Sequence, residues 1–160
     1  MSMKFYTLGV YNSTEEAFFE KLMANGIDLF CDIRMRRGVR GATYSFVNSA
    51  RLQEKLKTLD IAYEHLESLA PSPEIRQLQL DHDKAHGVKQ RERNALCEPY
   101  IRAYTAEVLQ GFDVDGALAR WSAARHQRIA FFCVEDVPHA CHRSLVLNAF
   151  REAGHPCEHL

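Results

Sequence analysis

The chain has 160 residues, of which 46% are hydrophobic and 26% are charged, and this composition predicts a folded globular domain rather than a disordered segment. The 20 Lys and Arg residues nearly balance the 21 Asp and Glu residues, so the net charge of −1 excludes a general nucleic-acid coat but is compatible with a local basic site. No apolar run reaches membrane-spanning length, which excludes a membrane as partner. Five cysteines without a CxxC pair predict a location in the reducing cytoplasm.

Apolar runs and helical periodicity alternate along the chain, beginning with a strand at residues 4–10. Ser13 and Glu16 then form a predicted capping box that opens a helix, and Gly26 ends it. In chain order, the pattern further predicts a strand over 27–33, a helix from Asn48 or Ser49 to about Leu59, a strand over 61–66, helices from Pro99 to Leu109 and from Asp113 through Trp121, a strand over 129–134, a helix over 138–153 and a strand over 157–160.

A polar, histidine-containing segment at about residues 71–97 interrupts the alternation, and we interpret it as an insertion or mobile flap with some helix. Alternating strands and helices predict an α/β fold, a three-layer α/β/α sandwich with a mostly parallel sheet of the flavodoxin-like or Rossmann-like kind. Because residues 129–134 are apolar throughout, we expect them to form a central strand. No repeat or linker divides the chain, so residues 1–160 are predicted to be a single domain.

Candidate catalytic residues follow the predicted central strand, where open parallel sheets bind their ligands. This strand ends in Cys133-Val134-Glu135, and a turn at Pro138 leads to Cys141 and His142 at a helix N-terminus. Free N–H groups there favour anions and a thiolate. We therefore predict Cys141 as nucleophile, Glu135 as general acid or base and His142 as a second proton carrier. The alternative is that both cysteines are small core residues.

Four arginines and no acid follow the second predicted strand: Arg34, Arg36, Arg37 and Arg40. Guanidinium groups bind phosphate through paired hydrogen bonds, so this loop suits a phosphate-bearing ligand. We predict that the ligand-binding residues are Asp32, Arg34, Arg36, Arg143 and Tyr11. The alternatives are a solvated loop with incidental charge and an Asp32 that is only the structural ion-pair partner of Arg34 or Arg143.

Soft metal ligands are also present near the central strand, at Cys133, His139, Cys141 and His142. Their spacing matches no familiar zinc pattern. His82 and His86 have helical spacing but lack the glutamate of an HExxH motif. We therefore predict no metal site and no cofactor.

These motifs together resemble the family called domain of unknown function 488. The resemblance is most specific in Cys-x-Glu followed by Cys-His-Arg, and its segments are Tyr6-Thr7-Leu8-Gly9, Asp32-Ile33-Arg34, Tyr63-Glu64-His65-Leu66, Cys133 to Arg143 and His159-Leu160. The family usually has His and Ser directly after the glycine, where this chain has Val10 and Tyr11, and often Pro and Ser where it has Met35 and further arginines. The resemblance implies an α/β/α sandwich with a pocket at the strand ends, and it implies no particular reaction.

Three functions follow from these observations. The first is a ligand-handling domain or an enzyme, in the latter case a hydrolase or transferase, that binds a phosphate-bearing partner, either a nucleotide or a nucleic acid. The second is a non-catalytic binding module in which the same residues form a structural ion-pair network. The third is a thiol redox or metal-responsive protein that uses Cys133 and Cys141. The sequence leaves the oligomeric state open.

Overall fold

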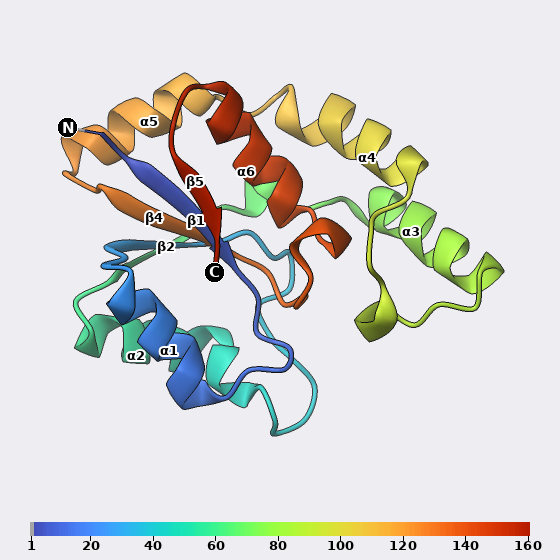
Figure 1. Ribbon diagram of the computed structural model, residues 1–160, viewed down its shortest axis with the longest axis horizontal. Helices are drawn as coiled ribbons and strands as arrows, with labels where there is room; N and C mark the ends of the chain where they lie inside the picture. Colours follow the sequence, from blue (N-terminus) through green and yellow to red (C-terminus); the bar gives the residue numbers. More distant parts are fainter. Residues whose placement is uncertain (1) are drawn as a thin grey trace.

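The computed structural model describes residues 2–160, apart from the side chain of Arg91, and its strands and helices alternate along the chain (Figure 1). The strands are β1 (Lys4–Leu8), β2 (Leu29–Asp32), β3 (Ala62–His65), β4 (Arg128–Phe132) and β5 (Cys157–His159). The helices are α1 (Glu15–Ala24), α2 (Ser49–Thr58), α3 (Pro73–Ala85), α4 (Glu98–Tyr104), α5 (Val114–Ala123) and α6 (Arg143–Glu152).

The five strands form one parallel sheet in the order β3-β2-β4-β1-β5. β4 lies at the centre, paired with β1 on one side and β2 on the other. The last four of its five residues are buried, which confirms the predicted central strand. In flavodoxin-like and Rossmann-like sheets β1 is the neighbour of β2, whereas here β4 lies between them, so the strand order differs from both.

Two hydrophobic cores flank the sheet because alternate residues of a strand face opposite sides. Ile129 and Phe131 of β4 belong to the core that α4, α5 and α6 cover, and Ala130 and Phe132 belong to the core that α1 and α2 cover. Figure 1 shows these two groups of helices on opposite sides of the strands. The predicted three-layer α/β/α sandwich is therefore confirmed.

Two helix starts differ from the sequence-based prediction. Thr14, not Ser13, caps α1, because its side chain accepts the hydrogen bond from the Ala17 N–H at 3.1 Å. The predicted helix over 138–153 divides into a short 3₁₀ turn, Pro138–Ala140, and α6. Cys141 between them is extended, with φ −138° and ψ 148°, and an extended residue cannot continue helical hydrogen bonding.

The polar segment at about residues 71–97 contains the 13-residue helix α3, which Ser72 caps by accepting a hydrogen bond from the Ile75 N–H. Ile75 is buried in the same core as Tyr100 of α4. A short 3₁₀ turn, Gln90–Glu92, follows, and this whole region lies beyond the carboxyl ends of the strands (Figure 1). Its mobility stays a prediction.

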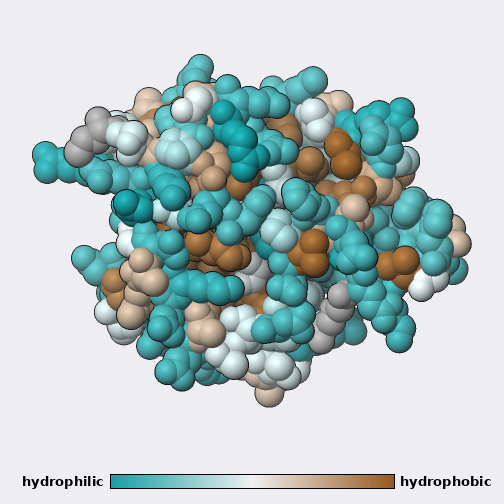
Figure 2. All heavy atoms as spheres, viewed as in Figure 1, coloured by the Kyte–Doolittle hydropathy of each residue, from teal (hydrophilic) through white to brown (hydrophobic). Residues whose placement is uncertain are grey.

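The face of the molecule in Figure 2 is mainly hydrophilic, with small separate hydrophobic areas between the polar side chains. The large hydrophobic side chains that are exposed include Leu78 and Leu80 on α3. Over residues 2–160, no helix combines the length and the apolar character that crossing a bilayer requires.

Candidate functional site

Buried polar side chains gather where β1, β2 and β4 end. Burial of such groups is costly unless each has a partner, so their clustering at one edge marks a built site rather than ordinary core. The buried residues at this edge are Thr7, Asp32, Arg34, Glu135, His142 and Arg143.

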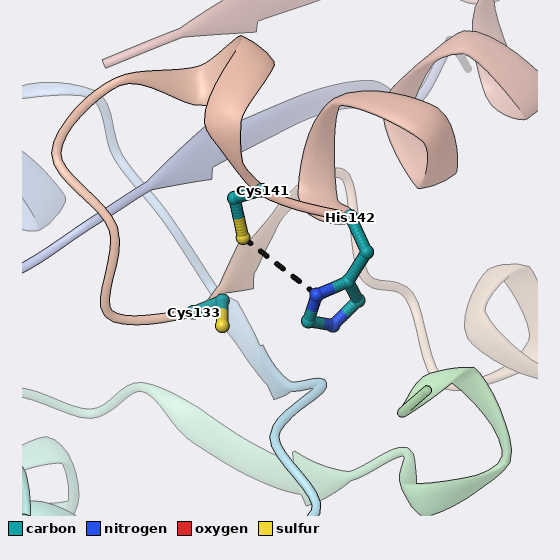
Figure 3. A group of neighbouring side chains, drawn as sticks. All are labelled: Cys133, Cys141 and His142. Atoms are coloured by element: carbon teal, nitrogen blue, oxygen red, sulfur yellow. Dashed lines mark hydrogen bonds between the residues drawn. The ribbon is translucent and has the colours of Figure 1, made fainter. Parts of the chain in front are cut away.

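A cluster of two thiols and an imidazole lies at the end of β4. Cys133 follows the strand, while Cys141 and His142 immediately precede α6, and the three side chains converge (Figure 3). The two Sγ atoms and one ring nitrogen of His142 lie within 4.8 Å of one another. The Cys141 Sγ is 3.7 Å from the His142 Nδ1. Cys141 is only 3% exposed and His142 only 5%, so bulk water is largely excluded.

The loop after β2 orients the His142 ring. Its Nε2 lies 3.0 Å from the Ile33 carbonyl oxygen. Because a carbonyl only accepts, the Nε2–H donates this hydrogen bond, and Nδ1 is left facing Cys141. The Tyr104 ring packs beside the imidazole, with centroids 5.6 Å apart. His142 is therefore held in one orientation with one nitrogen directed at the thiol.

The charges around the cluster favour a thiolate at Cys141. Burial by itself raises the pKa of Cys141, but the hydrogen bond from Cys133 and the positive charges of His142 and Arg143 outweigh it and hold this pKa well below its usual value. The hydrogen bond to Cys141, together with burial, raises the pKa of Cys133. Burial opposes charge on His142, yet the neighbouring Cys141 raises its pKa. The favoured state is a Cys141 thiolate beside a His142 imidazolium and a neutral Cys133 thiol.

Arg143 is fully buried and braces the loop between β4 and α6. Its Nη1 donates to the Glu135 carbonyl oxygen, its Nη2 donates to the Asp136 carbonyl oxygen at 3.0 Å and its Nε donates to the Thr7 hydroxyl at 3.3 Å. The partners are thus main-chain carbonyls and a hydroxyl, not the carboxylate of Asp32 or Glu135 that the sequence offers. In this structure the guanidinium shapes the loop, and its predicted contact with a ligand stays a prediction.

The Glu135 carboxylate lies under the segment that follows α3. It accepts a hydrogen bond from the Gln90 Nε2 at 2.6 Å, and the Arg93 Nη1 is 3.9 Å away. Arg93 is itself held by two hydrogen bonds to Asp83, at 2.6 and 2.9 Å. Burial raises the pKa of Glu135, against the lowering effect of the Gln90 hydrogen bond. Residues near 90–93 therefore cover this side of the cluster.

Asp32 and Arg34 form a separate group at the same end of the sheet. The Arg34 Nε and Nη2 donate to the two Asp32 carboxylate oxygens at 2.9 and 2.8 Å, and the Tyr63 hydroxyl donates to Asp32 at 2.8 Å. The Arg34 guanidinium also donates to the Val47 carbonyl and lies 4.8 Å from the Phe132 ring centroid. Val47 and Phe132 belong to the core under α1 and α2. Asp32 is thus the structural ion-pair partner of Arg34, the alternative that the sequence left open.

The remaining predicted ligand contacts lie nearer the surface. The Arg36 side chain is exposed, and Tyr11 is half-buried against Tyr44, with ring centroids 5.3 Å apart. The structure therefore brings Glu135, Cys141, His142 and Arg143 together, while Asp32 and Arg34 pack on the other side of the sheet. The loop after β2 joins the two groups, since His142 contacts the carbonyl of residue 33 and His65 that of residue 34.

Two site residues were not among the predicted ones, although both lie in the Thr-x-Gly segment that carries the resemblance. Thr7 accepts a hydrogen bond from Arg143 and contacts the His159 ring. Gly9 lies so close to the loop that a Cβ would be 2.7 Å from the Glu135 carbonyl carbon. This segment therefore supports the loop that carries the thiol cluster, and the motif was the signal that could have identified it.

These features define a parallel α/β/α sandwich with a buried thiol–imidazole cluster at its strand ends. A family model described as Domain of unknown function DUF488 matches residues 14–150 of the 160-residue chain, and the chain belongs to this family. The match includes the whole segment from Cys133 to Arg143. Comparison with curated proteins and with solved structures gives no match. The family description names no reaction.

Proposed function

We propose that the protein is an enzyme, a hydrolase or transferase, in which Cys141 is the nucleophile. The observation that supports this is the contact of 3.7 Å between the Cys141 Sγ and the His142 Nδ1, with His142 in turn oriented by the Ile33 carbonyl. A nucleophile, a base within reach and a third group that fixes the base are the parts that covalent catalysis requires.

In the proposed reaction His142 carries protons between Cys141, the leaving group and the acceptor. His142 accepts the Cys141 proton at Nδ1, and the thiolate attacks an electrophilic centre of the substrate to form a covalent adduct. The imidazolium gives the proton to the leaving group. Water or another acceptor then attacks the adduct, His142 takes the acceptor's proton, and Cys141 leaves as thiolate. Glu135 is a second candidate acid or base in this site.

The proposed substrate carries a phosphate group, as in a nucleotide or a nucleic-acid end. Two features support this class. The cluster immediately precedes α6, whose N-terminus favours an anion. Arg36 is exposed at the same end of the sheet and can pair with phosphate, whereas Arg34 and Arg143 hydrogen-bond to the chain itself.

Alkylation tests the nucleophile directly. We expect iodoacetamide at neutral pH to modify Cys141 faster than the half-buried Cys157, as followed by mass spectrometry of each cysteine peptide. His142→Gln should slow the alkylation of Cys141 by roughly 100-fold, the lower end of the rate enhancement that a general base contributes. The control His82→Gln, on exposed α3 surface, should leave the rate unchanged.

Two results would overturn the proposal: Cys157 reacting first, or a Cys141 rate that His142→Gln leaves unchanged. The substrate class is tested separately, by thermal shift with inorganic pyrophosphate and a short oligonucleotide. We expect stabilisation that Arg36→Gln reduces. If neither compound stabilises the protein, the phosphate assignment is contradicted. The proposed role of Cys141 as nucleophile is then unaffected.

A further inference from the structure

We infer that Cys133, Cys141 and His142 form a binding site for a soft divalent cation, with Zn²⁺ as the first choice, and that the bound ion blocks the chemistry of Cys141. The geometry of the three side chains by itself supports the metal site. The regulatory half of the inference rests on the proposed function, because blocking requires a nucleophile to block.

The distances fit zinc. Tetrahedral Zn²⁺ with Zn–S near 2.3 Å and Zn–N near 2.0 Å holds its ligand atoms about 3.5–3.8 Å apart. The Cys141 Sγ and the His142 Nδ1 are already 3.7 Å apart, and the Cys133 Sγ lies within 4.8 Å of the Cys141 Sγ and of a His142 ring nitrogen. A shift of about 1 Å at one thiol completes the three-ligand geometry. Figure 3 shows the Cys141 Sγ facing the His142 ring, with the Cys133 side chain beside them.

His142 also has the surroundings of a metal ligand. A histidine that binds a metal through one ring nitrogen nearly always donates its other N–H to a carbonyl or carboxylate, which fixes the tautomer and the ring orientation. The Nε2–H of His142 donates to the Ile33 carbonyl at 3.0 Å, and Nδ1 faces the thiols. This contact comes from the loop after β2, 109 residues earlier in the chain, so the fold, not local sequence, prepares the nitrogen.

The ligand types select the class of metal. Two thiols and an imidazole are soft or borderline ligands that suit zinc, whereas Mg²⁺ and Ca²⁺ require oxygen ligands. Three protein ligands leave the fourth tetrahedral position open, as in catalytic rather than structural zinc sites. The sequence-based prediction of no metal site relied on spacing between ligands, and the structure joins ligands from a strand end and a helix start that no spacing pattern describes.

Metal binding and proton transfer compete for the single lone pair of the His142 Nδ1. A zinc-bound Cys141 thiolate has given part of its negative charge to the ion and is a weaker nucleophile, and a zinc-bound His142 Nδ1 can no longer exchange a proton with the thiol. Bound zinc therefore switches off the pair that the proposed function requires, and a chelator restores it.

Titration with Zn²⁺ against a chromophoric chelator tests the site in the full chain. We expect one ion per chain and, with Co²⁺, a thiolate charge-transfer band. Loss of a partner outside the ligand shell already costs 10–100-fold in affinity, so Cys133→Ser and His142→Gln should each weaken binding by at least about 100-fold. Cys157→Ser is the matched control, because this half-buried cysteine on β5 lies outside the cluster, and it should bind as the unmodified protein does.

Iodoacetamide protection is a second test, and it needs no variant. Zinc should protect Cys133 and Cys141 but not Cys157, and EDTA should reverse the protection. The metal site is overturned if the protein does not bind Zn²⁺ stoichiometrically. It is also overturned if Cys133→Ser and His142→Gln both bind Zn²⁺ as tightly as the unmodified protein. If Cys141 reacts rapidly but zinc neither binds nor protects, the metal inference fails while the proposed function stands. If zinc binds and Cys141 is no more reactive than Cys157, the proposed function and the regulation fail while the metal site stands.

Discussion

Gly9→Ala tests whether the Thr-x-Gly segment supports the thiol cluster. The added methyl group would lie 2.7 Å from the Glu135 carbonyl carbon, and closer still to its oxygen. Main-chain atoms cannot rotate away as a flexible side chain can, so the loop after β4 has to move. The same carbonyl oxygen accepts a hydrogen bond from the buried Arg143, and its displacement strains or breaks that bond.

The expected loss of stability follows from these two contacts. Overpacking a tight site costs about 1–3 kcal/mol. A hydrogen bond from a charged donor contributes about 1.5–3 kcal/mol more. We therefore expect Gly9→Ala to lower the free energy of unfolding by about 2.5–6 kcal/mol. At about 2–4 °C per kcal/mol for a domain of this size, the melting temperature should fall by roughly 10 °C.

Thermal and urea unfolding of the variant measure this loss, and the Cys141 alkylation rate reports the loop. Gly38→Ala is the matched control, because a Cβ there has only the Asn48 Oδ1 at 3.8 Å nearby. This control should be neutral or slightly stabilising, since alanine restricts the unfolded chain. If Gly9→Ala and Gly38→Ala have the same melting temperature, the close contact between Gly9 and the loop after β4 does not contribute to stability, and the reasoning is refuted.

Two other predictions concern buried charge at the same edge. Asp32→Asn keeps the shape of the side chain but leaves Arg34 buried without its carboxylate, so urea unfolding should show a loss of about 3–5 kcal/mol; a loss below 1 kcal/mol would contradict a structural ion pair. Burial, together with the nearby positive charge of Arg143, lowers the pKa of His159 to about 4, so the folded protein holds this ring neutral while the unfolded chain protonates it near pH 6.5. The stability that depends on His159 is therefore complete above pH 6.5 and declines as the pH falls towards 4, and His159→Gln should remove that part of the pH dependence; identical pH profiles would show that the ring does not contribute.

Much of the fold follows from local sequence signals. The apolar run at 129–134 predicts the central strand, because a strand covered on both faces has no position for a polar side chain. Helical periodicity and glycine ends place most helices to within a few residues. These signals succeed because they depend on near neighbours. They fail at Cys141, where one extended residue divides the predicted final helix.

The pairing of charges at the site was beyond sequence reasoning. Asp32 had two candidate arginine partners, and the fold selects Arg34, which is two residues away on the same strand end. Arg143 turns instead to the carbonyls of its own loop and to Thr7 of β1. Each choice depends on which side of the sheet a side chain occupies and on which backbone groups lack partners there. A sequence pattern contains neither kind of information.

The sequence alone identifies Cys133, Glu135, Cys141 and His142 as chemically capable residues and places them near one strand end. It does not contain the distance between the two thiols and the imidazole, and it cannot orient His142. The Ile33 carbonyl does so from the loop after β2, more than a hundred residues earlier in the chain. Strand pairing of β2 with β4 brings that carbonyl to the ring, so the chemistry of the cluster depends on long-range contacts that form only when the sheet assembles.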